Sequence, residues 1–175
     1  MKKTIAVIGL GSIGWRHAEN LRELGHHVVG FDPVIMASDG FPVLWPIARL
    51  NEVDGILIAS PTVFHAEHLR LADAAEKPIF IEKPLADTLD DLPMGNVIMV
   101  GFNNRFHPCV QQAMEWIGKG MIDLPQWANL TLAQYSEKPP YLRDGVILNW
   151  SHEIDLALCL LGRAQVEASS TQVID

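Results

Sequence analysis

The chain has 175 residues, 49% of them hydrophobic and 19% charged, which is ordinary for a globular protein with one domain or one domain plus a small appendage. Its formal net charge of −8 disfavours nucleic acid as a partner, because surfaces that bind nucleic acid are basic. No apolar run approaches the ~20 residues of a membrane helix, and the short run after Lys2 and Lys3 lacks a signal-peptide cleavage site, so we expect a cytoplasmic protein without a membrane partner.

Up to Gly101, apolar runs that predict buried parallel strands alternate with segments that predict helices. The predicted strands span residues 5–9, 27–31, 55–59, 79–81 and 96–100, with a weaker one at 42–44. The first predicted helix spans residues 12–24 and carries a stripe formed by Ile13, His17, Leu21 and Leu24. Another helix follows Thr62 and ends at Glu76, and short ones are predicted at 46–50 and 87–92. This alternation predicts an α/β fold with a doubly wound parallel sheet.

The pattern changes after Gly101, so we expect a domain boundary near residue 102, with a first domain at 1–102 and a small α+β domain at 103–175. The second domain is predicted to hold helices at 108–118 and 146–161, strands at 127–134 and 165–173, and a proline-rich loop at 136–145. The two cysteines, Cys109 and Cys159, lie in apolar-periodic segments and are expected to be buried free thiols.

A glycine-rich turn, Gly9, Gly11 and Gly14, fits the G-x-G-x-x-G pattern between the first predicted strand and helix. Gly9 permits the tight turn, Gly11 leaves room for a pyrophosphate, and Gly14 lets the helix pack closely on the strand. The amides at the start of the helix, around Ser12 and Ile13, would then face the phosphates. By itself the pattern is weak, but its position after a strand and before a helix predicts a dinucleotide-binding Rossmann unit.

Asp32 ends the second predicted strand, close to the ~20-residue spacing expected for the acid that binds the ribose. A carboxylate there would accept hydrogen bonds from both ribose hydroxyls and repel a 2′-phosphate. No Lys or Arg follows it until Arg49, so NAD is favoured over NADP. The alternative is an Asp-Pro turn that merely follows a strand.

Four later segments carry a resemblance to a known family, and they lie at residues 60–65, 82–85, 101–108 and 145–155. Together with the glycine turn, and in the same order, they resemble the Gfo/Idh/MocA oxidoreductases, named after glucose–fructose oxidoreductase and inositol dehydrogenase. The Glu-Lys-Pro motif at 82–84 is the most specific of them. The resemblance implies further cofactor contacts from the segments after the third and fourth strands, at Ser60, Pro61, Thr62, His65, Glu82, Lys83 and Pro84.

Lys83 is the first catalytic candidate, because it follows a strand at the sheet edge where ligands of open α/β folds bind. Its ammonium group would stabilise charge on a reacting oxygen. The resemblance makes His152 the residue that exchanges the hydroxyl proton, a task that suits a histidine, although a histidine on an apolar helix is often a core residue. The family commonly has Asp one turn before this histidine; here Asn149 stands three residues before it and supports an imidazolium less well.

The remaining candidates are substrate-binding residues, Arg105, Tyr141 and Arg143, each of which reads equally well as a surface or capping residue. The histidines show no metal-ligand spacing, so no metal is expected. By the resemblance, family members are about twice as long as this chain, which is then either a shortened member or a fragment. A small sheet backed by one helix would expose its edges, so we expect a homodimer or a higher homo-oligomer.

These observations together predict an NAD-dependent oxidoreductase that moves hydride between nicotinamide and a secondary alcohol or ketone. By the resemblance, the substrate is a sugar, a cyclitol or a nucleotide-linked sugar. Two alternatives remain: a non-catalytic dinucleotide-binding sensor or scaffold module, and an oligomerisation protein with an empty nucleotide cleft.

Overall fold

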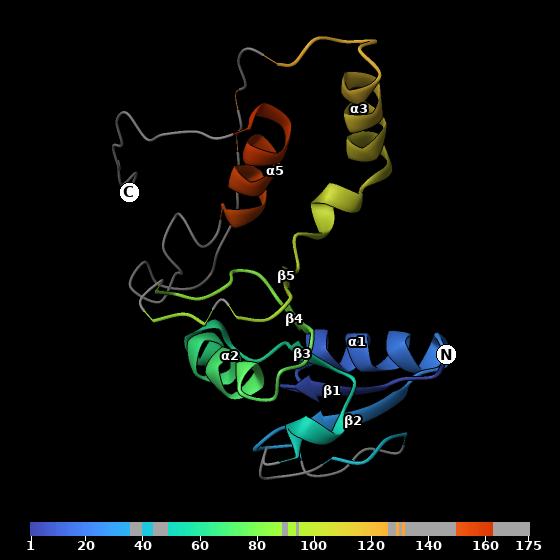
Figure 1. Cartoon of the computed structure of the whole chain (residues 1–175), viewed down its shortest axis with the longest axis vertical. Helices are drawn as coiled ribbons and strands as arrows, with labels where there is room; N and C mark the ends of the chain where they lie inside the picture. The colour runs from blue at the N-terminus through green and yellow to red at the C-terminus, as the bar shows by residue number, and fades with distance from the viewer. Residues whose placement is uncertain are drawn as a thin grey trace, which may run out of the picture. The chain divides into compact units, whose positions relative to one another are not determined.

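The computed structural model describes residues 1–35, 40–43, 49–88, 91–93, 95–125, 129, 131 and 150–162. The chain divides into two compact units, Met1–Gly101 and Phe102–Asp175, and each is described by itself (Figure 1). The predicted loop at 136–145 and strand at 165–173 lie outside the described residues, as do most of the predicted strand at 127–134 and the first residues of the predicted helix at 146–161.

The first unit is a five-stranded parallel sheet, as predicted, with the strand order β2-β1-β3-β4-β5. The strands are β1 (Thr4–Ile8), β2 (His27–Phe31), β3 (Gly55–Ile58), β4 (Ile79–Ile81) and β5 (Ile98–Val100). The main helices of this unit are α1 (Ser12–Glu23) and α2 (His65–Asp73), and one-turn 3-10 helices are formed by η1 (Leu50–Glu52) and η2 (Thr62–Phe64).

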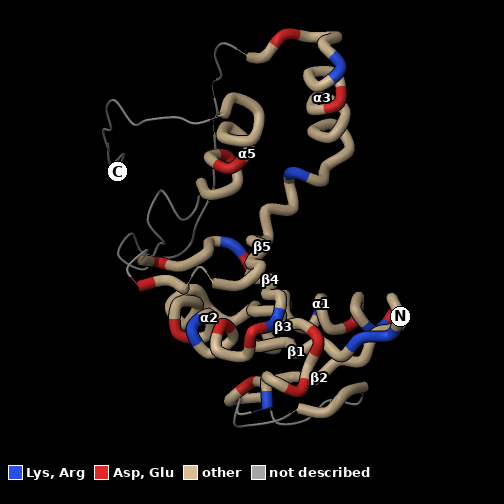
Figure 2. Tube along the Cα trace, viewed as in Figure 1, with Lys and Arg blue, Asp and Glu red and all other residues tan. Residues whose placement is uncertain are grey.

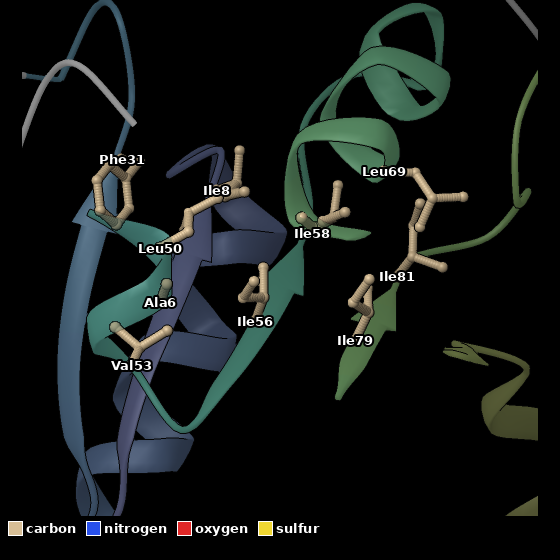
Figure 3. Close-up of a cluster of buried hydrophobic side chains, with 11 residues drawn as sticks. Ala6, Ile8, Phe31, Leu50, Val53, Ile56, Ile58, Leu69, Ile79 and Ile81 are labelled. Atoms are coloured by element: carbon tan, nitrogen blue, oxygen red, sulfur yellow. The ribbon is translucent and has the colours of Figure 1, made fainter. Parts of the chain in front are cut away.

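Alternation along the strands divides the core between the two faces of the sheet. One face carries the side chains of Ala6, Ile8, Ile56, Ile58, Ile79 and Ile81, which lie opposite one another in register and pack against Leu69 and Ala72 of α2 (Figure 3). The other face carries Val7, Val28 and Leu57, which pack with Ala18 of α1. Burying each large aliphatic side chain contributes about 1.5–3 kcal/mol, so the two clusters hold the sheet between its helices.

The sheet has a switch point between β1 and β3. The chain runs from β1 through α1 to β2 and then forms a single parallel bridge, Val43 to Gly30, beyond β2. It then returns to place β3 on the opposite side of β1. The described residues of the predicted strand at 42–44 therefore form only this bridge and no strand. Ligands of open α/β sheets bind at such a point, outside the carboxyl ends of the strands.

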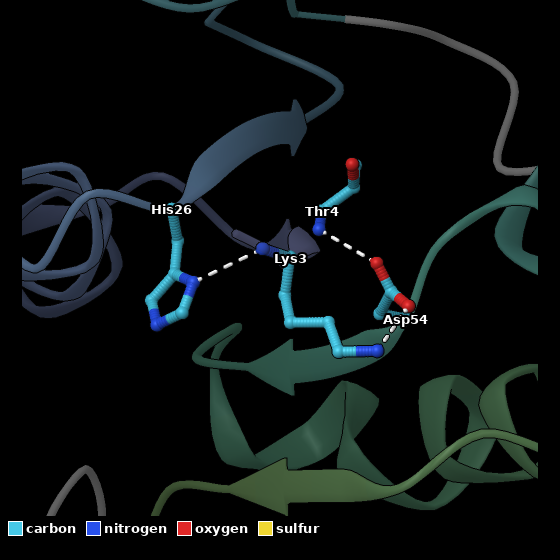
Figure 4. Close-up of polar contacts among 4 residues, drawn as sticks. All are labelled: Lys3, Thr4, His26 and Asp54. Carbon is cyan, nitrogen blue, oxygen red and sulfur yellow. Dashed lines mark hydrogen bonds and ion pairs between the residues drawn. The ribbon is translucent and has the colours of Figure 1, made fainter. Parts of the chain in front are cut away.

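The opposite end of the sheet is held by polar contacts (Figure 4). The Asp54 carboxylate, just before β3, accepts a hydrogen bond from the backbone N–H of Thr4 at 2.9 Å and another from the Lys3 ammonium at 2.9 Å. Both bonds lower the pKa of Asp54, and the bond from the Thr4 N–H has the larger effect. His26 Nδ1 accepts from the Lys3 N–H at 3.3 Å. These contacts join the amino ends of β1 and β3, away from the switch point.

Two helices of the first unit differ from the sequence prediction. Helix α1 buries Gly14 and Ala18, and Leu21 of the predicted stripe packs against the core, whereas Ile13 and Leu24 are 42% and 74% exposed, so the stripe was wrong at these two positions. Small residues face the sheet because the helix lies close against it. The second predicted helix is divided into η2 and α2 and ends before Glu76, whose φ of 55° is incompatible with a continuing helix.

The second unit contains η3 (Asn103–Phe106), α3 (Pro108–Gly118) and α5 (Ser151–Leu161). Helix α3 has the predicted bounds, because Pro108 suits the first helical position and His107 accepts a hydrogen bond from the N–H of Cys109. Figure 2 shows charge along α5 only near its start. The thiols are free, but Cys109 is exposed and Cys159 only half-buried, so the expectation of buried thiols was wrong. Among the described residues, no helix is long and apolar enough to cross a membrane.

Candidate functional site

The glycine turn between β1 and α1 packs closely at two positions and is open at the third. A Cβ on Gly9, whose φ is +86°, would lie 2.6 Å from the Ser60 backbone. A Cβ on Gly14 would lie 1.8 Å from the Gly9 carbonyl oxygen. A Cβ on Gly11 would meet no atom within 4 Å. Gly9 and Gly14 therefore bring β1, α1 and the end of β3 together, while Gly11 leaves space at the start of α1.

That space lies at the positive end of α1. The helix has Gly11 as its N-cap, no capping side chain and no acidic residue in its first turn. The first amides of a helix, here those of Ser12 and Ile13, have no partner within the helix itself. An anionic group with acceptor oxygens suits this position.

The Asp32 carboxylate joins the end of β2 to the glycine turn. Its Oδ2 accepts a hydrogen bond from the N–H of Leu10 at 2.8 Å, and its Oδ1 accepts from the N–H groups of Val34 and Ile35 at 2.8 and 2.9 Å. Burial raises the pKa of Asp32, but the three N–H donors outweigh it and hold the pKa below its usual value. The group is therefore an anion at neutral pH.

The acceptor capacity of Asp32 is largely taken up by the protein. A carboxylate offers about four lone-pair sites, of which these N–H groups occupy three, so about one remains, on Oδ2. One sugar hydroxyl can donate to Asp32 without displacing a backbone bond. If both ribose hydroxyls donate to Asp32, as predicted, at least one of them must compete with the backbone N–H of Leu10, Val34 or Ile35 for a carboxylate oxygen.

A cavity of about 350 Å³ opens beside Asp32, at the carboxyl ends of β1, β2 and β3. Its apolar and glycine lining is Ile8, Gly9, Phe31, Pro33, Val34, Pro61 and Phe64, and its polar lining is Asp32, Ser60, Glu67 and His68. Pockets for small ligands are commonly of this size, apolar with a few polar groups. A flat ring system attached to a hydroxylated sugar fits this lining. A larger apolar groove of about 490 Å³ lies beside α1 and contains none of the predicted site residues.

His68 is held in this cavity by Ser60. Its Nδ1 lies 2.8 Å from the Ser60 hydroxyl oxygen, and its ring lies 6.0 Å from that of Phe64. Burial is the main cause that lowers the pKa of His68. The nearby carboxylate of Glu67 raises this pKa, and repulsion from His65 lowers it, so the net shift is downward. His68 is thus neutral at neutral pH, and the described lining of the cavity contains no Lys or Arg.

The Glu82-Lys83-Pro84 motif directly follows β4. The Glu82 carboxylate contacts His17 Nε2 of α1 at 2.7 Å and accepts a bond from the N–H of Lys83 at 3.3 Å. The bond with His17 is the main cause that lowers the pKa of Glu82. The backbone N–H of Glu82 donates to the carbonyl oxygen of Ile58 at 2.8 Å. Lys83, half-buried, therefore starts from an anchored position at the same sheet edge as the glycine turn.

His65 links the two loops that follow β3 and β4. Its ring is 1% exposed, with Nδ1 2.8 Å from the Pro84 carbonyl oxygen and Nε2 2.8 Å from the Ser60 carbonyl oxygen. Pro61 and Thr62 form the turn between Ser60 and α2. The predicted cofactor residues of the first unit thus lie along one edge of the sheet.

In the second unit, an ion pair joins η3 to α5. The Arg105 guanidinium donates to both carboxylate oxygens of Asp155, with Nε 2.7 Å from Oδ2, and the carboxylate is buried while the Arg105 side chain is 45% exposed. This bond raises the pKa of Arg105 above its already high value. Two of the five N–H donors of Arg105 are therefore used in this ion pair, which leaves three for other partners.

His152 lies in the first turn of α5, with its ring edge toward Phe102 at a centroid distance of 6.1 Å. Its Nδ1 is buried and has no hydrogen-bond partner among the described residues, nor have the Ser151 hydroxyl and one oxygen of Glu153. Asn149, Tyr141 and Arg143 lie outside the described residues. Within the described part of the chain, no three His, Cys, Asp or Glu side chains gather as a metal site.

Sequence reasoning missed two contacts of this site, His17 with Glu82 and His68 with Ser60. The partners are 65 and 8 residues apart. A signal for His17 existed, because a histidine on the sheet-facing side of a helix needs a polar partner. His68 gave no such signal.

Comparison with known proteins places this geometry in a family. Residues 3–94 match the family described as "Oxidoreductase family, NAD-binding Rossmann fold". The chain belongs to the Gfo/Idh/MocA oxidoreductase family. This match extends over the glycine turn, residues 60–65 and the Glu-Lys-Pro motif, which carried part of the resemblance in the sequence, and it also contains Asp32.

Individual Gfo/Idh/MocA relatives match most of the chain. It is 28% identical over 92% of its length to the uncharacterized oxidoreductase YrbE of Bacillus subtilis, and 28% over 90% to scyllo-inositol 2-dehydrogenase (NAD(+)) of the same organism, covering 54% and 53% of those proteins. The structure of UDP-N-acetylglucosamine 3-dehydrogenase GnnA from Acidithiobacillus ferrooxidans matches with 25% identity and a TM-score of 0.72, over 95% of this chain and 57% of that one. The chain thus spans about half the length of the relatives it matches.

Proposed function

We propose that this chain is an NAD-dependent oxidoreductase that acts on a secondary alcohol or its ketone. The observation that carries the proposal is the bond from the Leu10 N–H to the Asp32 carboxylate, which makes the glycine turn and the ribose-binding acid one structure beside a cavity of suitable size. Membership of an oxidoreductase family with an NAD-binding fold supports it.

The residues of the first unit fit the proposed cofactor. The open space at Gly11 suits the diphosphate, with the amides of Ser12 and Ile13 as donors, and the cavity between Asp32 and Phe64 suits the adenosine. When bound, NAD supplies the hydride acceptor or donor of the reaction. The further contacts that we assign to it come from Gly9, Gly14, Ser60, Pro61, Thr62, Glu82, Lys83 and Pro84, with His65 acting through the loops it joins.

NAD is preferred to NADP in this proposal. Two carboxylates, Asp32 and Glu67, line the cavity in which a 2′-phosphate would lie, and the described lining has no Lys or Arg to neutralise it. Bringing like charges together in a half-buried site is unfavourable. The binding of NADP is therefore expected to be weaker than that of NAD.

The catalytic groups in this proposal are Lys83 and His152. The Lys83 ammonium donates a hydrogen bond to the reacting oxygen and stabilises the charge that develops there. His152 takes the hydroxyl proton or returns it, and Asn149 orients its ring. Arg105, through the N–H groups that do not contact Asp155, holds the hydroxyl groups of the substrate together with Tyr141 and Arg143.

The proposed substrate is a sugar, a cyclitol or a nucleotide-linked sugar. Relatives named as inositol and scyllo-inositol dehydrogenases, and a structural neighbour named as a UDP-N-acetylglucosamine dehydrogenase, support this range. We include a cytoplasmic location, without a membrane partner, in the same proposal.

The test is turnover of the native chain with NAD across a panel of inositols, sugars and UDP-sugars, compared with Lys83→Ala. Losing one donor to a developing oxyanion is expected to lower kcat by about 10²–10³-fold. Lys77→Ala, at the amino end of the same strand, is the matched control and should leave activity unchanged. Equal rates for native protein and Lys83→Ala would contradict the role of Lys83.

The second candidate is a non-catalytic dinucleotide-binding module. Asn149 in place of an aspartate favours it, because an amide supports an imidazolium less well than a carboxylate does. This candidate predicts NAD binding without NADH formation for any compound of the panel. An oligomerisation protein with an empty cleft, by contrast, predicts no NAD binding at all.

We also propose that the chain forms a homodimer or a higher homo-oligomer. The second unit exposes large apolar side chains, namely Phe106, Met114, Trp116, Met121, Ile122, Leu124, Ile154 and Leu158. Exposed large apolar side chains in such number favour association. Sedimentation equilibrium at micromolar concentration tests it, and a monomer under those conditions would contradict it.

A further inference from the structure

The buried imidazole of His65 contacts two acceptors. The ring stands at the first residue of α2 and is 1% exposed. Nδ1 lies 2.8 Å from the carbonyl oxygen of Pro84, and Nε2 lies 2.8 Å from the carbonyl oxygen of Ser60. A backbone carbonyl accepts hydrogen bonds and cannot donate them. Each of the two contacts therefore requires a proton on the ring nitrogen.

A neutral imidazole has one N–H and satisfies only one of these carbonyls. Its other nitrogen would then direct a lone pair at a carbonyl oxygen 2.8 Å away. We propose that His65 is an imidazolium whose two N–H groups clamp the loop after β3 to the loop that carries Lys83.

This clamp makes His65 a positioning residue. Ser60 lines the cavity beside Asp32, and Pro84 directly follows Lys83. The ring thus sets the spacing between the wall of the cavity and the lysine, although it is buried too deeply to line the cavity itself. This consequence for catalysis rests on the proposed function, whereas the protonation of the ring does not.

The charged groups around the ring favour or oppose its second proton. The charged or titratable side chains nearby are His68 and Glu67 on α2, and Glu82 and Lys83 beside Pro84. Among the described residues, no carboxylate is hydrogen-bonded to His65. Burial and the positive end of α2 both disfavour a charged imidazolium. The two charge-assisted bonds to the carbonyl oxygens favour it. Loss of either proton would remove one of the two bonds and free one loop from the clamp.

Nuclear magnetic resonance of protein with ¹⁵N-labelled histidine tests the protonation directly. Signals of His65 are assigned with the variants His65→Asn and His65→Gln. We expect both ring nitrogens to carry protons in the folded protein. A ring that keeps one unprotonated nitrogen at every pH at which the protein stays folded would overturn the proposal.

The same two variants separate the two halves of the clamp. The side-chain amide of Asn replaces Nδ1 and keeps the bond to Pro84, while that of Gln replaces Nε2 and keeps the bond to Ser60. His65→Gln is expected to lower kcat about tenfold with little change in the Kd for NAD, because the lysine loop is released. His65→Asn is expected to weaken NAD binding more than it lowers kcat.

Leu69→Val, on the buried side of the same helix, is the control for lost packing. It should lower the midpoint of thermal unfolding without separating kcat from NAD affinity. If both His65 variants lose kcat and NAD affinity in the same proportion, His65 is a packing residue and the positioning role is wrong. If the native chain has no turnover, the proposed function fails, and the protonation of the ring still decides whether the clamp exists.

Discussion

The two units differ in how they bury apolar side chains. Within the described residues, every fully buried hydrophobic side chain belongs to Met1–Gly101, and the helices of Phe102–Asp175 contribute none. The described part of the second unit contains the ion pair of Arg105 with Asp155, and many of its large apolar side chains are exposed. The lesson is that a parallel sheet with helices on both faces closes its own core, whereas two amphipathic helices need a partner surface. The proposed nucleotide site lies in the closed unit.

The largest expected effect comes from Gly14→Val. Its side chain would start 1.8 Å from the Gly9 carbonyl oxygen, and the backbone there cannot move without opening the sheet edge. We expect a loss of about 3 kcal/mol in the free energy of unfolding, measured by denaturant titration, because overpacking of this kind is severe.

Gly11→Ala is the matched control, since its methyl group meets no protein atom within 4 Å. It should unfold like the native chain but bind NAD more weakly, because the methyl group occupies the space assigned to the diphosphate. Native NAD affinity in Gly11→Ala would contradict that assignment.

The second-largest effect is expected for Asp155→Asn, which tests whether the two units unfold separately. Asp155→Asn removes the charge that Arg105 contacts, and we expect a loss of about 1–2 kcal/mol, less than for a fully buried pair because Arg105 is partly exposed. Hydrogen exchange should become faster at the amides of α5 and stay unchanged in β1 and β3. Faster exchange in both units would mean that they unfold together.

Asp32→Asn is expected to have a third, smaller effect. The amide loses the charge and turns its NH2 group toward at least one of the backbone N–H donors. NAD should therefore bind about tenfold more weakly, equivalent to about 1.4 kcal/mol, and the ratio of NAD to NADP affinity should fall. Calorimetric titration with both nucleotides measures the change. An unaltered preference would show that Asp32 does not select against the 2′-phosphate.

The pH dependence of stability follows from the same carboxylate. The pKa of Asp32 is lower in the folded chain, so its contribution is fully present above the pKa of the unfolded chain and is lost as the pH falls through the folded value. Asp32→Asn should therefore lose less stability than the native chain on acidification. Urea titrations at neutral and acidic pH measure the difference, and parallel losses would contradict it.

The smallest effect is expected for His17→Gln. The variant keeps a hydrogen bond to Glu82 but removes the imidazole that lowers the pKa of that carboxyl group. We expect a loss of about 1 kcal/mol or less, because the pair is only half-buried. His27→Gln, on an exposed side chain of β2, is the control. A larger loss would mean that the β4 loop depends on this contact.

The sequence predicted those features of the first unit that are determined by residues close together in the chain. Buried strands appear as apolar runs, and Gly9, Gly11, Gly14 and Asp32 were found because a turn and the strand end beside it follow a fixed spacing. The stripe on α1 was wrong at Ile13 and Leu24, because closeness to the sheet favours the small residues Gly14 and Ala18.

Contacts between distant residues were beyond sequence reasoning. His17 with Glu82 and Arg105 with Asp155 are 65 and 50 residues apart, and nothing in the spacing of a single sequence pairs them. The role of His65 depends on two carbonyl oxygens, and every residue has one, so no pattern of residue types could mark it.

Titration of the native chain with NAD and NADP in a calorimeter tests the central assignment most directly. A cradle formed by the glycine turn and Asp32 predicts saturable binding of one NAD per chain and clearly weaker binding of NADP. Absence of NAD binding, or tighter binding of NADP, would contradict it.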